Sequence, residues 1–355
     1  MNDVYFLRAK KFEPLEKLLK RLSYLFSKSN ILMNVEPEDF IAVKIHCGED
    51  TNTTSIRPEI IFQLANDLKL KTERVFITDP NVLYQSSRKN AIEHLMLMES
   101  RGISTHKARV PVIIADGLLG SNSVKVPIDK KHFKTVDIAT DIAMSHGMLV
   151  VSHPTGHLSA GYGGAIKNVG MGCASRKGKL QMHSKMKPKI NKNKCTACMQ
   201  CITWCPMSAI SLVEKKAVID QEKCIGCGQC LAVCRFDAVK FDWRIDPGEF
   251  QEKIVEYAYG AVKSKTEKTA YTNVLLNITK DCDCIRKSQI PLMEDIGILA
   301  SDDPVAIDTA SLYLIKEINK KRLRDMAYDI DYTVQLRYAQ ELGMGSIDFN
   351  LIEIE

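Results

Sequence analysis

The chain has 355 residues, of which 45% are hydrophobic and 26% are charged, and its formal net charge is +6. This composition is typical of a globular protein with one large α/β domain and a small second one, and it excludes a fibrous, disordered or miniature disulfide-stapled protein. No segment reaches the roughly 18 to 20 continuous apolar residues that span a bilayer, and the first residues lack the apolar core of a signal peptide, so we expect a cytoplasmic protein with no membrane partner.

The first half of the chain alternates predicted strands with predicted helices. Short β-branched or apolar segments predict buried strands at residues 40–45, 74–78, 110–115 and 147–152. Amphipathic segments between them predict helices at residues 58–70 and 87–99. This alternation indicates an α/β fold with a mostly parallel sheet.

Polar loops follow each of these four strands. Because parallel strands end at the same edge of a sheet, we expect the loops to share one ligand-binding crevice. The polar residues that we single out after the successive strands are His46, Cys47, Glu49, Asn52 and Arg57, then Asp79, Asn81, Tyr84, Arg88 and Asn90, then Asp116, then His153 and His157. Taken singly, each loop could equally be an ordinary polar loop with a helix cap.

A glycine-rich segment, residues 161–179, comes next and contains Lys167, Asn168, Arg176, Lys177 and Lys179. Glycines leave backbone amides open to close approach, so the segment predicts an anion or phosphate cradle, or else a flexible connection to the cysteine-rich part of the chain. It matches neither a Walker loop nor the dinucleotide fingerprint.

Positive charge is concentrated around this segment. Residues 142–211 contain no Asp or Glu but nine basic residues. This field predicts an anionic small-molecule substrate, a phosphate-bearing cofactor or an acidic protein partner, or else a solvated basic loop. Nucleic acid is disfavoured because no aromatic residues are interleaved with the lysines. The basic residues are Lys167, Arg176, Lys177, Lys179, Lys185, Lys187, Lys189, Lys192 and Lys194.

Two runs of cysteines come after the glycine-rich segment, and the second repeats the first at an offset of 29 residues. The repeat predicts a duplicated unit of strand, cysteine loop, short helix and strand, with the segments AISLV and AVKFDW as the paired strands. Such spacing is typical of the bacterial ferredoxin motif, in which the fourth cysteine of each run ligates the other cluster. Two four-cysteine zinc sites are the alternative, although zinc sites normally use separated pairs. We therefore assign one 4Fe-4S cluster to Cys195, Cys198, Cys201 and Cys234, and a second to Cys224, Cys227, Cys230 and Cys205.

After Trp243 the α/β pattern resumes. It predicts helices at residues 247–263 and 304–318, strands at 272–278 and 296–300, and a helical and then extended end. The expected organisation is an α/β core formed by residues 1–185 and 244–355, with a small α+β bacterial-ferredoxin-like domain, residues 186–243, inserted into it.

Two further cysteines, Cys282 and Cys284, follow the strand predicted at 272–278. They could chelate an additional soft metal together with Cys47, Cys173, His153 or His157, form a redox-active thiol pair, or be inert buried thiols. The remaining histidines, His94, His106, His132 and His183, are expected at packing or surface positions.

Several phrases resemble an iron-sulfur protein family that joins a large domain of unknown function to a 2x4Fe-4S ferredoxin-type module. They include VKIHCGEDTNTTSIRP, ITDPNVLYQSSRKNAIEH, PVIIADGLLG, SHPTGHLSAGYGGAIKNVGMGCASRKGK and DCDC followed by IGILASDDPVAIDTAS. The resemblance implies an α/β core site of unassigned chemistry and an anaerobic bacterial or archaeal setting. Arg235 departs from the proline usual after the fourth cysteine. Family motif positions are His46, Glu49, Asn52, Arg57, Asp79, Tyr84, Arg88, Lys167, Asn168, Cys282 and Cys284.

These features favour an electron-transfer protein, with a ferredoxin-linked oxidoreductase as the first hypothesis. A soluble donor or acceptor protein would exchange low-potential electrons with the clusters, and these would pass to a substrate or metal in the core. The alternatives are a non-enzymatic electron carrier, a docking module for a partner redox enzyme, and a maturation factor for a metal cofactor. In the enzyme hypothesis the catalytic residues are His46, Glu49, Lys167, Cys282 and Cys284, with His46 and Glu49 as the proton donors. Lys167 and Arg57 hold anionic groups, and the cofactor-binding residues are Arg57, Asp79 and Asn168.

Overall fold

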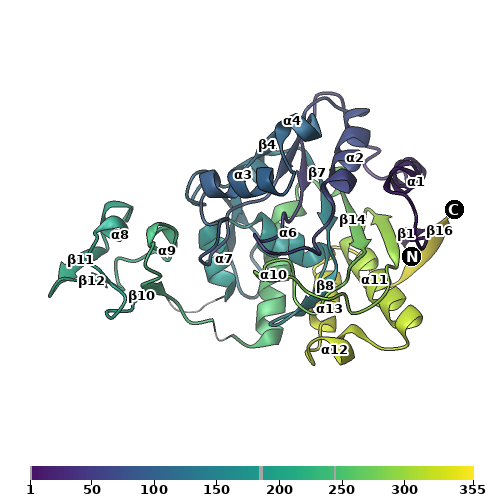
Figure 1. Cartoon of the computed structure of the whole chain (residues 1–355). Helices are drawn as coiled ribbons and strands as arrows, with labels where there is room; N and C mark the ends of the chain where they lie inside the picture. Colours follow the sequence, from purple (N-terminus) through teal and green to yellow (C-terminus); the bar gives the residue numbers. More distant parts are fainter. Residues whose placement is uncertain (1, 184–186, 244) are drawn as a thin grey trace.

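The core of the fold is an eight-stranded sheet with the strand order β16-β1-β15-β14-β7-β2-β3-β4. The structure is a computed structural model that describes residues 2–183, 187–243 and 245–355 (Figure 1). Within these residues β15 pairs antiparallel with β1 and β14, and the other neighbouring pairs are parallel. The strands are β1 (Asn2–Arg8), β2 (Ile41–Lys44), β3 (Val75–Thr78), β4 (Val112–Ile113), β7 (Gly147–Ser152), β14 (Thr269–Leu275), β15 (Gly297–Ser301) and β16 (Phe349–Ile354).

Helices cover both faces of this sheet, so the core has three layers (Figure 1). Successive side chains of a strand point to opposite faces. In β2, Ile41 and Val43 join one apolar cluster and Ala42 joins the other. The first cluster includes α1 (Leu15–Lys28), α2 (Pro58–Lys69), α3 (Ala91–Ser100) and α4 (Thr105–Ala108). The second includes α5 (Thr140–Met144), α6 (Ala165–Cys173), α7 (Arg176–His183), α10 (Pro247–Val262), α11 (Pro304–Asn319), α12 (Leu323–Met326) and α13 (Thr333–Glu341).

The prediction of an α/β fold with a mostly parallel sheet is confirmed. Every strand and helix predicted for the core has a counterpart, with ends that differ by a few residues. The sequence pattern does not predict β1 or α1, and β1 lies between β15 and the C-terminal strand β16. Smaller elements complete the core: the hairpins of β5 (Ser123–Pro127) with β6 (Thr135–Ala139) and of β8 (Thr155–His157) with β9 (Gly161–Gly163), and the 3-10 helix η1 (Thr266–Lys268).

Most of the glycine-rich segment forms α6 and α7, so it is not a flexible connection to the cysteine-rich segment. Its glycines permit close packing instead. A Cβ atom built on Gly170 would lie 2.1 Å from the carbonyl oxygen of Ile254. The backbones of α6 and α10 can therefore approach each other this closely only because residue 170 has no side chain.

The cysteine-rich segment, residues 187–243, protrudes from one side of the core (Figure 1). Its two repeats run β10-α8-β11 and β12-α9-β13, which matches the predicted order of strand, helix and strand. The segments AISLV and AVKFDW do contain strands, but these pair with other partners, because β11 pairs with β12 and β13 pairs with β10. The elements are β10 (Lys189–Ile190), α8 (Gln200–Thr203), β11 (Ile210–Val213), β12 (Lys216–Ile219), α9 (Gln229–Val233) and β13 (Val239–Lys240).

In the part of the chain that the structure describes, no helix has the length and apolar character needed to cross a membrane.

Candidate functional site

A cavity of about 400 Å³ lies where the segments after β2, β3, β7 and β14 meet α6, α7 and α10. These four strands are mutually parallel, so their carboxyl ends share one edge of the sheet, where α/β proteins commonly bind ligands. Polar residues that line it include His46, Asp79, Tyr84, Arg88, His153, His157, Lys167, Asn168, Lys179, His183, Cys282, Asp283 and Cys284.

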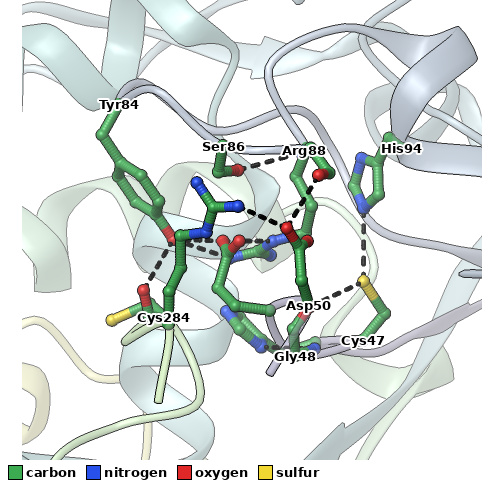
Figure 2. A network of polar contacts seen from close by, with 12 residues as sticks. Cys47, Gly48, Asp50, Tyr84, Ser86, Arg88, His94 and Cys284 are labelled. Atoms are coloured by element: carbon green, nitrogen blue, oxygen red, sulfur yellow. Dashed lines mark hydrogen bonds and ion pairs between the residues drawn. The ribbon is translucent and has the colours of Figure 1, made fainter. Parts of the chain in front are cut away.

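Arg88 organises one wall of the cavity (Figure 2). Its buried guanidinium places Nε 2.9 Å from Glu49 Oε1 and Nη1 3.1 Å from Asp79 Oδ2. Nη2 donates to the hydroxyl of Tyr84 at 2.8 Å, and that hydroxyl donates to Glu49 at 2.9 Å. Although burial opposes it, these partners hold the pKa of Arg88 well above its ordinary value, so the cation is permanent.

The two predicted proton donors are placed differently. His46 lines the cavity, while Glu49 lies behind Arg88 and Tyr84 and is not among the described lining residues. Burial, and then Arg88, lowers the pKa of His46 well below its ordinary value, so the imidazole is neutral near pH 7. His46 therefore meets a ligand as a neutral group, whereas Glu49 can act on the cavity only through its two neighbours.

Asp79 and Asn168, predicted to bind a cofactor, both line the cavity and share Lys44 as a partner. Lys44 Nζ lies 3.3 Å from Asp79 Oδ1 and donates to Asn168 Oδ1 at 2.8 Å. Burial opposes ionisation of Asp79, but Lys44 and the other cations around it hold its pKa well below the ordinary value. Both side chains thus join β2, β3 and α6 to one another as well as facing the cavity.

Lys167 faces the cavity from the first turn of α6. Its ammonium group makes no hydrogen bond or ion pair with any described residue, unlike Lys179, whose Nζ donates to the carbonyl of Ala174 at 2.6 Å. Among described residues, neither Arg57 nor Asp116 lines the cavity: Arg57 is exposed at the start of α2, and Asp116 is buried against Asn81. The prediction that Arg57 binds an anion therefore has no support from its position, whereas Lys167 presents an unpaired cation.

The other basic residues do not form a single patch. Arg176 is buried and donates to backbone carbonyls, and Lys177 pairs with Asp137 at 3.0 Å. Lys194 pairs with Asp237, while Lys185 lies outside the described residues. Several of the positive charges in residues 142–211 are thus buried or paired with carboxylates of the same chain.

Cys282 and Cys284 line the cavity and are joined by a disulfide bond. A ring nitrogen of His157 and both sulfurs lie within 4.8 Å of one another, close enough for a metal by distance alone. Between the two cysteines, Asp283 Oδ2 lies 2.8 Å from Nδ1 of His153. Burial opposes it, but Asp283 raises the pKa of His153.

Cys47 and Cys173, the other candidate ligands for a metal at Cys282 and Cys284, lie elsewhere. Cys47 Sγ is 3.4 Å from His94 Nε2 in a separate buried group that includes Asp79, and Cys173 is buried in the apolar core. Figure 2 shows Cys47 and His94 on one side of the Arg88 network and Cys284 on the other. Neither Cys47 nor Cys173 therefore joins Cys282 and Cys284.

One wall of the cavity is formed by aromatic residues that the sequence analysis does not predict. It consists of His183, Trp243 and Phe250, and the His183 ring centroid lies 4.8 Å from each of the other two. Burial, and then Lys167 and Lys179, lowers the pKa of His183 to about 3, so this ring is neutral. His183 does pack against other rings, as expected of a packing residue, but it also lines the cavity, which was not expected. No motif signals this wall, because its members come from separate segments that only the folded chain brings together.

The eight cysteines of the two runs line two small cavities in groups of four. One is lined by Cys195, Cys198, Cys201 and Cys234, and the other by Cys205, Cys224, Cys227 and Cys230. Each group combines three cysteines of one run with the fourth of the other. Backbone amides of Ala209, Ala217 and Ala238 donate to sulfurs of these groups at 3.3 to 3.4 Å.

Residues 83–85 connect the cysteine-rich segment to the main cavity. Gln85 Nε2 donates to the carbonyls of Leu231 and Cys234 at 2.8 and 2.9 Å. The Tyr84 hydroxyl lies 3.3 Å from the carbonyl oxygen of Cys284, and Leu83 lines the main cavity while packing in the apolar cluster of the cysteine-rich segment. Together, these three consecutive residues link the cysteine-rich segment to the main cavity.

The fold and the cavity define an α/β protein with a ligand-sized site at the carboxyl edge of its sheet and a cysteine-rich segment able to bind metal. The chain belongs to the family described as domain of unknown function (DUF362), whose model matches residues 41–313. It is similar to the lactate racemase apoprotein from Thermoanaerobacterium thermosaccharolyticum at 10% sequence identity and a TM-score of 0.43. That similarity covers 86% of this chain and 55% of the racemase chain, so the chain spans about half the length of that structure. No curated protein matches the chain.

We expect Lys167 to lose its proton near pH 8, because burial, and then Arg88, lowers its pKa to about 8. The rate at which acetic anhydride modifies Lys167, followed by mass spectrometry, should reach half its maximum near that pH, since the neutral amine is the reactive form. The reference is the same rate for N-acetyl-lysine amide. A midpoint equal to that of the reference would refute the placement of Lys167 in a desolvated site.

Proposed function

We propose that the protein is an iron-sulfur oxidoreductase in which residues 186–243 carry two 4Fe-4S clusters that supply electrons to the core formed by residues 1–185 and 244–355. The grouping of the eight cysteines carries the proposal: each cavity offers four sulfurs, three from one run and one from the other, as two-cluster ferredoxin modules require. Amide hydrogen bonds to the sulfurs are a further feature that suits thiolate ligands of such clusters. When bound, the clusters supply one-electron transfer at low potential.

The proposed destination of the electrons is the Cys282–Cys284 disulfide and, beyond it, a substrate in the main cavity. Residues 83–85 favour this route because they contact the carbonyl of Cys234 at one end and that of Cys284 at the other. Two electrons cleave the sulfur–sulfur bond and leave two thiolates, which can then reduce a substrate and re-form the disulfide.

Lys167 supports an anionic substrate for this reaction. Its unpaired ammonium group faces a cavity whose carboxylates already have cationic partners: Asp79 is bound to Arg88 and Lys44, and Asp283 to His153. The aromatic wall of His183, Trp243 and Phe250 would contact an apolar or planar part of the same molecule. A soluble low-potential carrier is the proposed electron donor.

The proposal is tested by giving the anaerobic protein about two electrons per chain from a reduced low-potential ferredoxin, the number that one disulfide consumes. Electron paramagnetic resonance reports the clusters, and maleimide labelling reports the thiols of the tryptic peptide Asp281–Arg286, which holds both cysteines. We expect oxidised clusters and labelled thiols in the wild type, and clusters that stay reduced in the C282S/C284S double variant. C173A, which removes a buried thiol of the core, is the matched control and should behave like the wild type. An intact disulfide beside reduced clusters in the wild type would refute the proposed route.

A further inference from the structure

The hydrogen bonds of His157 decide which chemistry its ring can offer to Cys282 and Cys284. His157 Nδ1 accepts from the backbone amides of Ser159 and Ala160, at 3.2 and 3.0 Å. A ring nitrogen has a single lone pair in the plane of the ring, and these two amides occupy that of Nδ1. In the neutral ring the proton must then reside on Nε2, for which no partner is found among the described residues.

The neutral state of this ring is a consequence of its surroundings. Burial, and then Lys167 and His183, holds the pKa of His157 well below the ordinary value. Phe250 stacks against the ring with centroids 6.2 Å apart, which fixes the plane of the imidazole. The ring is therefore an oriented N–H donor rather than a cation.

A metal ion bound by His157 would require a free lone pair, and neither nitrogen offers one. If Nδ1 faced the sulfurs, its lone pair would already be shared by the two amides; if Nε2 faces them, it carries the proton. Transferring the proton to Nδ1 would set an N–H against two backbone N–H groups. The group formed by His157, Cys282 and Cys284 therefore meets the distance criterion for a metal but not the hydrogen-bonding one.

We infer that His157 serves the Cys282–Cys284 pair as a fixed hydrogen-bond donor that stabilises a thiolate in the reduced state, and that it is not a third metal ligand. When two electrons cleave the disulfide, one sulfur takes a proton from solvent and the other remains a thiolate that accepts from His157 Nε2. Hydrogen bonds to charged groups are stronger than those between neutral groups, so the reduced pair gains more from His157 than the disulfide does. The inference rests on the redox role proposed for the pair, and its test uses dithiothreitol so that it does not depend on the clusters.

The test compares three substitutions in the full chain purified anaerobically. H157N keeps a side-chain oxygen near the position of Nδ1, so it can still accept from the amides of Ser159 and Ala160, but it lacks the Nε2 donor. H157Q places an amide N–H near the position of Nε2. H106Q changes an exposed histidine of α4 that is not among the residues lining the cavity. Each protein is equilibrated with mixtures of reduced and oxidised dithiothreitol, and the peptide Asp281–Arg286 is labelled to measure the reduced fraction.

For H157N we expect the equilibrium constant for reduction to fall about tenfold, since a hydrogen bond to a charged group is lost. This corresponds to a midpoint potential lower by about 30 mV for a two-electron couple. H157Q should recover most of the wild-type value, and H106Q should match the wild type. Equal constants in H157N, H106Q and the wild type would overturn the inference.

Zinc affinity of the reduced protein gives an independent measurement. If His157 were a ligand, H157N would weaken zinc binding in competition with a chelator by about tenfold or more, since even the loss of a group that only contacts a metal ligand costs about 10- to 100-fold. We expect no weakening relative to H106Q. A loss of zinc affinity confined to H157N would overturn the inference even if electron delivery to the disulfide were established.

Discussion

Replacing Cys234 with Ala should remove one of two iron-sulfur clusters, and it should be the cluster held by the first run of cysteines. Cys234 lies in the cavity lined by Cys195, Cys198 and Cys201, although four other cysteines lie between Cys201 and Cys234 in the sequence. The ferredoxin-type arrangement predicts about eight irons per chain, so C234A should retain about four. The measurement is iron and acid-labile sulfide per chain, with electron paramagnetic resonance of the dithionite-reduced protein.

C205A provides the matched comparison, because Cys205 lies in the other cavity with Cys224, Cys227 and Cys230. Each variant should show the spectrum of a single uncoupled cluster, and the two spectra should differ because different clusters remain. C173A should keep the full iron content and the spectrum of two coupled spins. Two zinc ions per chain in place of iron would show that the assignment of the clusters is wrong. Loss of the same cluster signal in both C234A and C205A would show this too.

The grouping of the cysteines could be predicted in part from sequence because most members of each group are close together in the chain. Three cysteines within seven residues can surround one point without help from the rest of the fold, as Cys195, Cys198 and Cys201 do around one small cavity. The crevice could be predicted for a related reason: parallel strands bring His46, Asp79 and His153 to one edge whatever the details of packing.

Residues whose role depends on packing could not be assigned in this way. Glu49 and Arg57 follow the same strand as His46, yet one is buried behind Arg88 and the other is exposed at the start of α2. The aromatic wall was missed because Trp243 and Phe250 flank the junction of two regions and carry no motif. Spacing also left open whether Cys282 and Cys284 chelate a metal. The amides that engage His157 decide against its participation, and these are backbone contacts that no residue pattern reveals.

The largest loss of stability from one substitution near the cavity is expected for R88M. Arg88 is 1% exposed and pairs with Glu49, which is fully buried, and with Asp79. Methionine fills similar space but leaves two buried carboxylates without their shared cation. Breaking a buried ion pair by removing one partner costs about 3 to 5 kcal/mol. The midpoint of urea unfolding, followed by far-ultraviolet circular dichroism under anaerobic conditions, should fall accordingly, whereas R322M, which breaks an exposed pair with Asp325, should change it little.

The ion pair between Arg88 and Asp79 should also affect how the stability of the protein depends on pH in acid. Its pKa is held well below the ordinary value of 3.8, so its ionised form stabilises the folded chain above that pH, and this stabilisation is lost as the pH falls through the depressed pKa. Arg88 is one of the cations responsible, so the loss of stability on acidification should be smaller in R88M than in the wild type, with Lys44 maintaining the remainder. An R88M protein with wild-type stability near pH 7 and an unchanged acid dependence would show that Arg88 does not hold this wall of the cavity together.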